Sequence, residues 1–316
     1  WNSVEQRYKD KRGLIDGRRL GCQAQVMGDV VIDVPAESQV HKQVVRKRAE
    51  ARDIVLNPST KLFYVEVQEP DMHDPSGDLE RLCAALKEQW QLENVKADLQ
   101  ILQVMQKILR KGGWKVTVAV HLGDDENPPR IMHLWPGFYE GTVYGLAVDL
   151  GSTTIAAHLC DLQTGDVVAS SGVMNPQIRF GEDLMSRVSY SMMNEGGAEE
   201  MTRSVRAGMN TLFDEICAEG GVDKGLIVDA VFVCNPVMHH LFLGIDPFEL
   251  GQAPFALATS NALRMRAVEL DLTIHPSARI YFLPCIAGHV GADAAAVALS
   301  EAPDKSDDLV LVVDVG

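Results

Sequence analysis

The sequence predicts an α/β protein with a mixed sheet, preceded by a small α+β domain. From Tyr144 onward, three β-like runs come first, and helical patterns then alternate with further β-like runs. Before that point, two amphipathic helical patterns lie among three β-like runs. The 316 residues are 46% hydrophobic and 23% charged, which is typical of a globular chain long enough for two domains.

Composition excludes several classes of function. The 29 basic and 44 acidic residues give a net charge of −15, which argues against nucleic acid or an anionic membrane as the main partner. No apolar run is long enough to span a bilayer and no signal peptide opens the chain, so a cytoplasmic location is expected. The six cysteines are scattered without a Cys-X-X-Cys pair, so neither a disulfide framework nor a zinc site built from them is expected.

The first 40 residues resemble the tail of a small β domain. Ala24–Met27 and Val30–Val34 are β-like runs joined by a Gly-Asp turn, and Pro35 ends the second run. This segment is too short to hold a hydrophobic core, so either it packs against a neighbouring domain or its beginning is missing. Residues 41–53 are rich in Lys, Arg and Glu and are expected to form a linker.

Residues 54–142 predict a middle α+β domain. The apolar residues after Asp78 keep helical spacing as far as Trp90, and a glycine pair closes a second helical pattern. The second helix is expected to bury Leu99, Leu102, Met105 (or Val104), Ile108 and Leu109. The expected elements are a strand at Leu62–Val67, helices from Asp78 and over Val95–Lys111, and strands at Val116–Leu122 and Ile131–Leu134.

Residues 143–316 predict the α/β lobe. Its first three strands are separated by short polar turns, which indicates an antiparallel meander. The expected strands are Gly145–Asp149, Ile155–Leu162, Val167–Val173, Val228–Cys234, Arg279–Leu283 and Leu309–Asp314. The expected helices are Glu182–Met193, Glu199–Ala218, Val237–Leu243 and the small-residue helix Gly288–Leu299.

Two similar phrases, Leu146–Gly151 and Leu311–Gly316, each deliver an aspartate and then a glycine from a strand into a turn. A glycine lets the backbone approach a phosphate closely, and the first phrase continues into Ser152-Thr153-Thr154. Phosphoryl chemistry needs a carboxylate for Mg²⁺ together with N–H and hydroxyl groups for phosphate oxygens. An ordinary hairpin with a polar turn is the alternative, and the second phrase favours a phosphate site.

The order of these segments resembles the superfamily of actin, heat-shock chaperone and sugar-kinase ATPases. The shared order is a phosphate-binding hairpin, a strand–helix pair, a strand entering a small-residue helix, and a second Asp-X-Gly strand. The run Ala287–Ala296 matches the connecting helix of that family, although a tightly packed core helix would have the same pattern of small residues. The resemblance implies an actin-like (ribonuclease H-like) fold for the lobe.

A narrower resemblance covers nearly the whole chain. The phrases that carry it are Asn175-Pro176-Gln177, Phe180–Arg187, Asn235 with Met238–Leu241, and Leu283-Pro284 with Ala287–Asp293. They are similar to the ATP-dependent reductive activators of corrinoid proteins. Such proteins begin with a β-grasp, plant-type [2Fe–2S] ferredoxin domain, to which residues 1–40 would belong.

The resemblance implies a function and site residues. ATP hydrolysis would drive a change on an inactive Co(II) corrinoid protein, so that an electron from the [2Fe–2S] cluster restores Co(I). Asp149 and Asp314 would hold hydrated Mg²⁺ from opposite lobes, with Asp293 as a further catalytic candidate. The nucleotide phosphates would lie near Gly151, Ser152, Thr153, Thr154, Gly316 and, less firmly, Asn235.

The chain also departs from that family. Cys22 matches the fourth cluster cysteine, but a plant-type cluster needs a Cys-X4-Cys-X2-Cys run before it, and no cysteine precedes Cys22. The second phosphate loop stops at Gly316. The chain is therefore expected to be an internal fragment that is inactive alone; the alternative is a short protein that lost both sites.

Several polar residues remain open. Glu182, Asp183 and Arg187 either face the cleft or serve the start of a helix, because acidic residues also favour a helix N-terminus. His239 and His240 are adjacent on a helix, where side chains diverge, so a structural role is favoured over a metal site.

Two rival functions remain open. A small-molecule kinase of the superfamily would phosphorylate a metabolite without a redox centre. A docking module for a methyltransferase complex would need no catalysis. The expected partner is a corrinoid protein or methyltransferase component, and a homodimer is possible; the sequence does not identify the corrinoid protein or the methyl donor.

Overall fold

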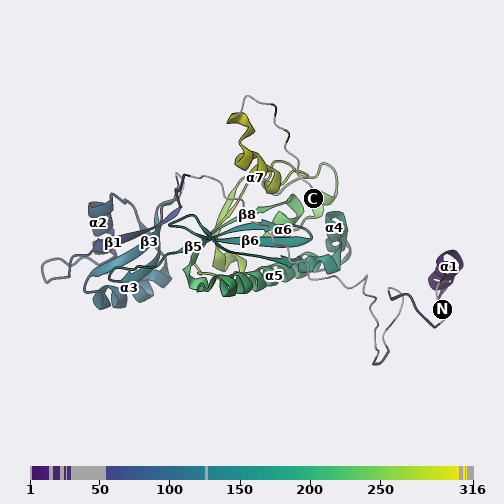
Figure 1. The fold of residues 1–316 in the computed structure, drawn as a ribbon, viewed down its shortest axis with the longest axis horizontal. Coiled ribbons are helices and arrows are strands. Elements are labelled where there is room, and N and C mark those ends of the chain that lie inside the picture. Colours follow the sequence, from purple (N-terminus) through teal and green to yellow (C-terminus); the bar gives the residue numbers. More distant parts are fainter. Residues whose placement is uncertain are drawn as a thin grey trace. The chain divides into compact units, whose positions relative to one another are not determined.

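The computed structural model describes residues 2–13, 17–21, 25, 27–29, 55–124, 127–305, 309 and 311 (Figure 1). The chain divides into two compact units, residues 1–43 and residues 44–316. The first unit contains helix α1 (Ser3–Arg12), which the sequence analysis missed. Its signal is a capping box, in which the Asn2 side chain accepts from the Glu5 N–H and the Glu5 carboxylate accepts from the Asn2 N–H.

The predicted β-hairpin of the first unit and the linker fall almost entirely outside the described residues. Glu5 is buried against Arg19, whose Nε donates to the carboxylate at 2.8 Å. This contact ties α1 to the segment that precedes Cys22.

The α+β domain is built on a four-stranded sheet. The strand order is β1-β3-β4-β2, with β1, β3 and β4 antiparallel and β2 parallel to β4. Helices α2 and α3 pack on this sheet around one apolar core, centred on residues such as Leu82, Leu109 and Val118. The elements are β1 (Thr60–Glu66), α2 (Asp78–Trp90), β2 (Lys96–Ala97), α3 (Leu99–Lys111), β3 (Lys115–His121) and β4 (Arg130–Pro136).

The second helix of this domain begins later than predicted. Lys96 and Ala97 pair with β4 instead of opening the helix, and α3 starts at Leu99. Its buried residues are Ile101, Met105 and Leu109. Leu99 and Leu102 are 68% and 40% exposed, so their predicted burial is wrong. Met105 is the buried one of the pair Met105 or Val104. The sequence carries two overlapping apolar stripes, and packing on β3 and β4 selects the one spaced by four residues.

The α/β lobe has the mixed sheet that the sequence predicted. The strand order is β7-β6-β5-β8-β10-β9. The first three strands form the antiparallel meander, β8 is parallel to β5, β10 is parallel to β8, and β9 is an antiparallel edge that the sequence analysis missed. The strands are β5 (Tyr144–Leu150), β6 (Thr154–Asp161), β7 (Val167–Met174), β8 (Ile227–Cys234), β9 (Leu263–Arg266) and β10 (Arg279–Phe282).

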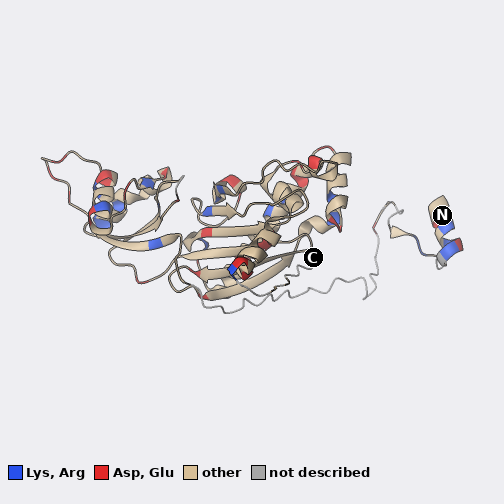
Figure 2. Ribbon diagram, turned by 90° about the horizontal axis from the view of Figure 1, so that it is seen from above, with Lys and Arg blue, Asp and Glu red and all other residues tan. Residues whose placement is uncertain are grey.

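The described helices of the lobe follow the order that the sequence predicted, and the expected last strand, Leu309–Asp314, lies almost entirely outside the described residues. The long helix α5 (Gly197–Gly220) packs along β6 and β7, and α6 (Pro236–Leu243) follows β8 (Figure 1). Figure 2 shows that the lobe's strands are mostly uncharged and that Lys, Arg, Asp and Glu lie mainly on helices and connections. The remaining long helices are α4 (Leu184–Met193) and α7 (Ala292–Glu301).

The small-residue helix also begins later than predicted, at Ala292 instead of Gly288. A Cβ on Gly288 would lie 2.1 Å from the Phe255 carbonyl oxygen, and one on Gly291 would lie 2.5 Å from the Cys234 carbonyl oxygen. These glycines therefore let a loop approach other backbone closely; they do not pack a helix.

The α+β domain and the lobe meet along a seam, defined here by an apolar cluster and three polar contacts. Ala119, Met132, Val143 and Val228 are buried together there. Burying an apolar side chain contributes about 1.5–3 kcal/mol against about 1 kcal/mol for a net hydrogen bond, so the apolar cluster dominates the seam. The polar contacts are Ser59 with Asp229, Gln100 with Ser277, and Asp124 with Arg264.

None of the described helices is both long enough and apolar enough to cross a membrane.

Candidate functional site

The turn between β5 and β6 lies where the sequence predicts a phosphate site. It runs over Gly151, Ser152 and Thr153, and Asp149 is the next-to-last residue of β5. A Cβ on Gly151 would lie 2.5 Å from the Thr154 carbonyl oxygen, so the turn closes this tightly only with glycine. Ser152 and Thr154 are half-buried and Thr153 is exposed.

Three carbonyl groups of this turn are held from inside the lobe. The Asn175 side chain donates to the Gly151 oxygen at 2.8 Å, the Arg187 guanidinium donates to the Ser152 oxygen at 2.5 Å, and the Asn175 N–H donates to the Thr153 oxygen at 2.8 Å. In a trans peptide the C=O and N–H point in opposite directions. The N–H groups of Ser152 and Thr153 are therefore directed away from these partners, as an anion-binding turn requires.

Arg187 resolves one of the open alternatives. Its side chain is fully buried, and no carboxylate pairs with it within the described ranges. Besides Ser152, its guanidinium donates to the Gly181 oxygen at 3.0 Å and the Gln177 side chain at 3.4 Å. Burial lowers the pKa of this guanidinium from its usual value. The Arg187 side chain therefore holds the turn from the interior of the lobe and does not point into a cleft.

Asp149 and Asp293 lie at the same edge of the sheet. Asp149 is in register with Val233 on the parallel strand β8, so the carboxyl ends of β5 and β8 meet there. Gly291 packs against Cys234 and Asn235, which brings Asp293 beside the end of β8. Burial raises the pKa of the Cys234 thiol, and Cys285, Asp293 and Asp149 raise it further. Both predicted carboxylates thus act electrostatically on one thiol.

Other polar candidates serve as helix caps. The Asn235 side chain accepts from the Met238 N–H at 2.9 Å and caps α6. The Asp183 side chain accepts from the Ser186 N–H at 2.7 Å and caps α4. Glu182 is exposed. These roles match the helix-start alternative for Asp183 and leave a nucleotide contact of Asn235 as a prediction.

Three predicted site residues, Cys22, Asp314 and Gly316, lie outside the described residues. Their roles stay predictions from the sequence.

Of the two adjacent histidines, His240 is held in the fold through both of its ring nitrogens. The Nδ1 of His240 contacts the Pro236 oxygen at 2.8 Å, and its Nε2 accepts from the Ala258 N–H at 3.1 Å, so Nδ1 carries the proton. Neither ring nitrogen of His239 has a hydrogen-bond partner in the described part of the chain. No group of three or more potential metal ligands occurs among the described residues.

The burial of His239 leads us to expect that the folded state loses stability in acid. Burial, with a smaller effect of His240, lowers its pKa to about 4. The folded state therefore binds fewer protons than the unfolded state between about pH 4 and 6.5, so this stability is complete above that window and is lost as the pH falls through it. We expect wild-type protein to lose roughly 3 kcal/mol more than His239→Leu between pH 7 and pH 4 in urea unfolding.

The matched control for that experiment is His73→Leu, because His73 is exposed in the loop before α2. An equal loss of stability in wild type and His239→Leu would contradict the buried neutral histidine.

Sequence reasoning named Arg187 only as a cleft or helix-start candidate and Asn175 only within the family resemblance, and it missed that both hold the turn. Asn175 and Arg187 are 24 and 35 positions from the carbonyl groups they bind, and their side-chain contacts leave no periodic pattern. The one available signal was that both residues stand inside phrases of the family resemblance.

Comparisons with known proteins identify the relatives of this chain. A model described as "RACo linker region" matches residues 49–141, and one described as "RACo middle region" matches residues 144–306. The corrinoid activation enzyme RamQ of Eubacterium limosum is 33% identical over 180 residues, which cover 56% of this chain and 30% of RamQ. The solved structure of a reductive activator for corrinoid, iron-sulfur protein has a TM-score of 0.73 and 30% identity, covering 87% of this chain and 45% of that one. The chain thus spans less than half the length of these relatives.

Proposed function

Since this chain belongs to the RACo family, we propose that it is part of an ATP-driven activator of a corrinoid protein. The reaction proposed is reduction of inactive Co(II) to Co(I) in the partner, with ATP binding and hydrolysis supplying the free energy. The observation that carries the proposal is the turn Gly151–Thr153, whose three carbonyl groups are held on one side.

The described residues fit a magnesium nucleotide. Asp149 places a carboxylate at the strand end, where it would hold Mg²⁺ through water. The N–H groups of Ser152 and Thr153, with the hydroxyls of Ser152, Thr153 and Thr154, would bind the phosphate oxygens. Asp293 would orient the attacking water from the start of α7. Asp314 and Gly316 would close the site from the second phosphate loop.

An iron–sulfur cluster does not fit the residues of this chain alone. A plant-type cluster takes four cysteines, and the sequence has only Cys22 before Cys83. Within the proposal, the electron for cobalt comes from a [2Fe–2S] cluster in the intact protein, to which Cys22 would contribute one ligand. The relatives' names, a corrinoid activation enzyme and a reductive activator for corrinoid, iron-sulfur protein, support a corrinoid protein or methyltransferase component as partner.

The test uses the intact protein under anaerobic conditions with a Co(II) corrinoid protein and a low-potential reductant. We expect the Co(I) absorption band to grow with ATP and Mg²⁺, and not with a non-hydrolysable ATP analogue. Growth of Co(I) at the same rate without ATP would overturn the ATP dependence.

The rival small-molecule kinase shares the phosphate turn and predicts a different spectrum. A kinase would show no visible cluster bands and would consume ATP only with a metabolite present. Cluster bands together with ATP-dependent Co(I) formation exclude it.

A further inference from the structure

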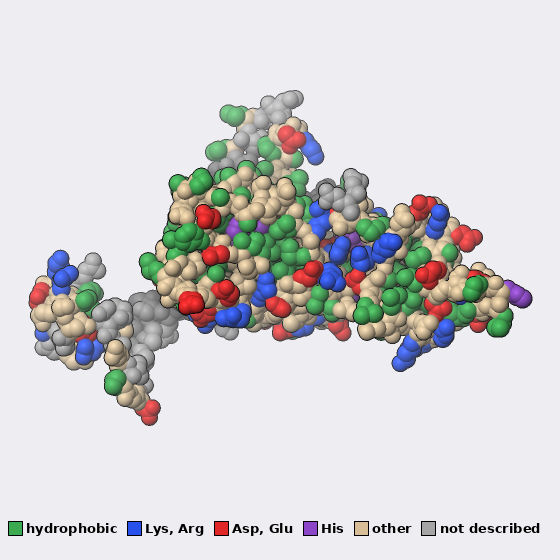
Figure 3. All heavy atoms as spheres, turned by 180° about the vertical axis from the view of Figure 1, so that it is seen from behind, with side chains coloured by type: hydrophobic (Ala, Val, Ile, Leu, Met, Phe, Trp, Pro, Cys, Tyr) green, Lys and Arg blue, Asp and Glu red, His purple; other side chains and the backbone are tan. Residues whose placement is uncertain are grey.

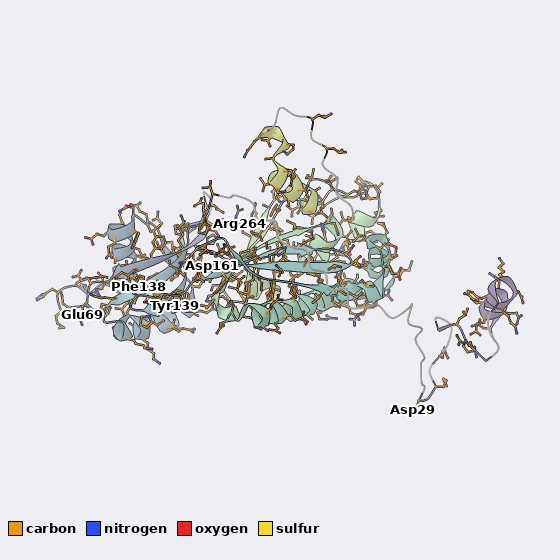
Figure 4. The ribbon with its side chains drawn as sticks, viewed as in Figure 1. Asp29, Glu69, Phe138, Tyr139, Asp161 and Arg264 are labelled. Carbon is orange, nitrogen blue, oxygen red and sulfur yellow. The ribbon has the colours of Figure 1, made fainter. Side chains whose placement is uncertain are left out.

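A second pocket lies at the seam, at the opposite end of the strands from the phosphate turn. It has a volume of about 270 Å³ and opens where β8 and β10 begin. Figure 4 shows Arg264 where the sheets of the α+β domain and the lobe approach one another. Polar side chains from both domains line the pocket: Ser59, His121, Asp124 and Asn127 from one, and Asp229, Arg264, Arg279 and Tyr281 from the other. Asp124 and Arg264 form an ion pair with each other.

Arg279 is an arginine without an acceptor. Neighbouring arginines Arg130, Arg264 and Arg266 each form an ion pair with a carboxylate. No ion pair or hydrogen bond of the Arg279 guanidinium is formed within residues 55–124 and 127–305. Burial lowers the pKa of this guanidinium, and Arg130 lowers it further. A half-buried cation without a hydrogen-bonded acceptor is a costly arrangement. Asp98 and Glu269 favour its charge from a distance, and a ligand that supplies a direct acceptor would stabilise it further.

His121 presents a hydrogen-bond donor to the same pocket. Its Nδ1 accepts from the Gly123 N–H at 3.1 Å, so a neutral ring carries its proton on Nε2. Burial first, and then the positive charge of Arg279, lower the pKa of His121 to about 4, which keeps the ring neutral at pH 7. The Nε2 lies 4.0 Å from the nearer Asp229 oxygen, beyond hydrogen-bond reach.

The Asp229 carboxylate and the Arg279 guanidinium interact electrostatically but are not in direct contact. The two residues are register partners on β8 and β10, yet they form no ion pair. The Asp229 carboxylate instead accepts hydrogen bonds from the Ser59 hydroxyl and the Ala230 N–H. Burial raises the pKa of this carboxylate to about 6.

We propose that the seam pocket binds a small oxyanion, a carboxylate or a phosphate, which pairs with Arg279 and accepts a hydrogen bond from His121 Nε2–H. The bound oxyanion would contact both domains, because His121 belongs to the α+β domain and Arg279 to the lobe. Figure 3 shows Lys and Arg side chains gathered where these two parts of the chain meet, although the whole chain carries a net charge of −15. The proposal is independent of the nucleotide site.

The test is calorimetric titration of the intact protein with sulfate, inorganic phosphate and succinate, at ionic strength matched with chloride. Saturating Mg-ADP is present so that the phosphate turn is occupied. We expect at least one probe to bind, with affinity about tenfold lower in Arg279→Gln, the loss of one charge-assisted pair. Arg266→Gln is the matched control, since Arg266 faces Arg279 across the strands, pairs with Glu269 and does not line the pocket.

The probes also separate the two ligand sources. Tighter succinate binding indicates a carboxylate metabolite, and tighter phosphate or sulfate binding indicates an inorganic or phosphorylated ligand. No binding of any probe, an unchanged affinity in Arg279→Gln, or an equal loss in Arg266→Gln would overturn the proposal.

A second variant keeps the test decisive if Arg279→Gln fails to fold. Asp229→Asn removes the nearby negative charge and should raise sulfate affinity several-fold at pH 8. In wild type the affinity should rise as the pH falls through about 6, because Asp229 is then protonated. The charged or titratable groups nearest Asp229 are His121 on β3 and Arg279 on β10, while its register partner on β5 is Gly145. The ion pair of Asp124 with Arg264, and Tyr281 on β10, also line the pocket. A pH dependence that persists in Asp229→Asn counts against the site.

If Mg-ADP itself fails to bind, the proposed ATPase function fails. The comparison of wild type with Arg279→Gln still decides whether the seam pocket binds an oxyanion.

Discussion

Asp149→Ala in the intact protein is expected to abolish ATP-dependent formation of Co(I). Asp149 is half-buried at the end of β5, beside the turn that would bind the phosphates. Removing a group that stabilises charge in the transition state typically lowers the rate by about 10²–10³-fold. The measurement is the growth of the Co(I) absorption band under anaerobic conditions, together with phosphate release from ATP.

The matched control is Asp166→Ala, because Asp166 is exposed in the β6–β7 turn at the other end of the meander. We expect this control to activate the corrinoid protein at the wild-type rate. Activation that is undiminished in Asp149→Ala would remove the phosphate turn from the mechanism.

Arg187→Lys is expected to weaken ATP binding while the fold is retained. A lysine keeps the charge but lacks the fork that donates to Ser152, Gly181 and Gln177 together. The Ser152 carbonyl would no longer be held, and the N–H groups of the turn would lose their fixed direction. A hydrogen bond from a charged donor contributes about 1.5–3 kcal/mol of stabilisation. If the turn binds ATP less well by that amount, the Kd for ATP should rise at least about tenfold.

Arg187→Met should have a larger effect on stability than Arg187→Lys. It leaves the partly buried oxygens of Ser152 and Gly181 without this donor, at about 1–3 kcal/mol each. Calorimetric ATP titration and thermal unfolding separate the two effects. The control is Arg179→Met, since Arg179 is exposed and only loosely paired with Glu200 at 3.9 Å. A fall in stability without any change in ATP affinity would reduce Arg187 to a purely structural residue.

The parts of the fold that the sequence predicts well are those specified by local patterns. The meander β5–β6–β7 follows from apolar runs and polar turns, and α2 and α5 follow from helical spacing. The starts of α3 and α7 depend on tertiary contacts instead. Lys96 and Ala97 join β4 across 34 positions, and Gly291 packs against a strand that ends 57 positions earlier. No window of local sequence contains either contact.

In the candidate site, too, local patterns could be predicted from the sequence and tertiary contacts could not. Asp149 could be placed at the sheet edge because a strand pattern ends there, and parallel strands bring their carboxyl ends together. The bracing of the turn by Asn175 and Arg187 could not be predicted, since it depends on side chains that fold back from later elements. The pairing of Asp149 with Asp314 stays a prediction, because Asp314 is outside the described residues.

Strand β8 connects two places that are chemically unlike. Asp229 stands near its beginning, at the oxyanion pocket, and Cys234 ends it, beside the candidate nucleotide carboxylates. Five residues of extended strand separate them by roughly 17 Å. If occupancy at one end alters affinity at the other, linkage requires the two ligands to alter each other's affinity by the same factor. An oxyanion that raised the affinity for ATP would bind more tightly while ATP is bound and would dissociate more readily after hydrolysis. Occupancy of the seam pocket would then depend on the state of the bound nucleotide.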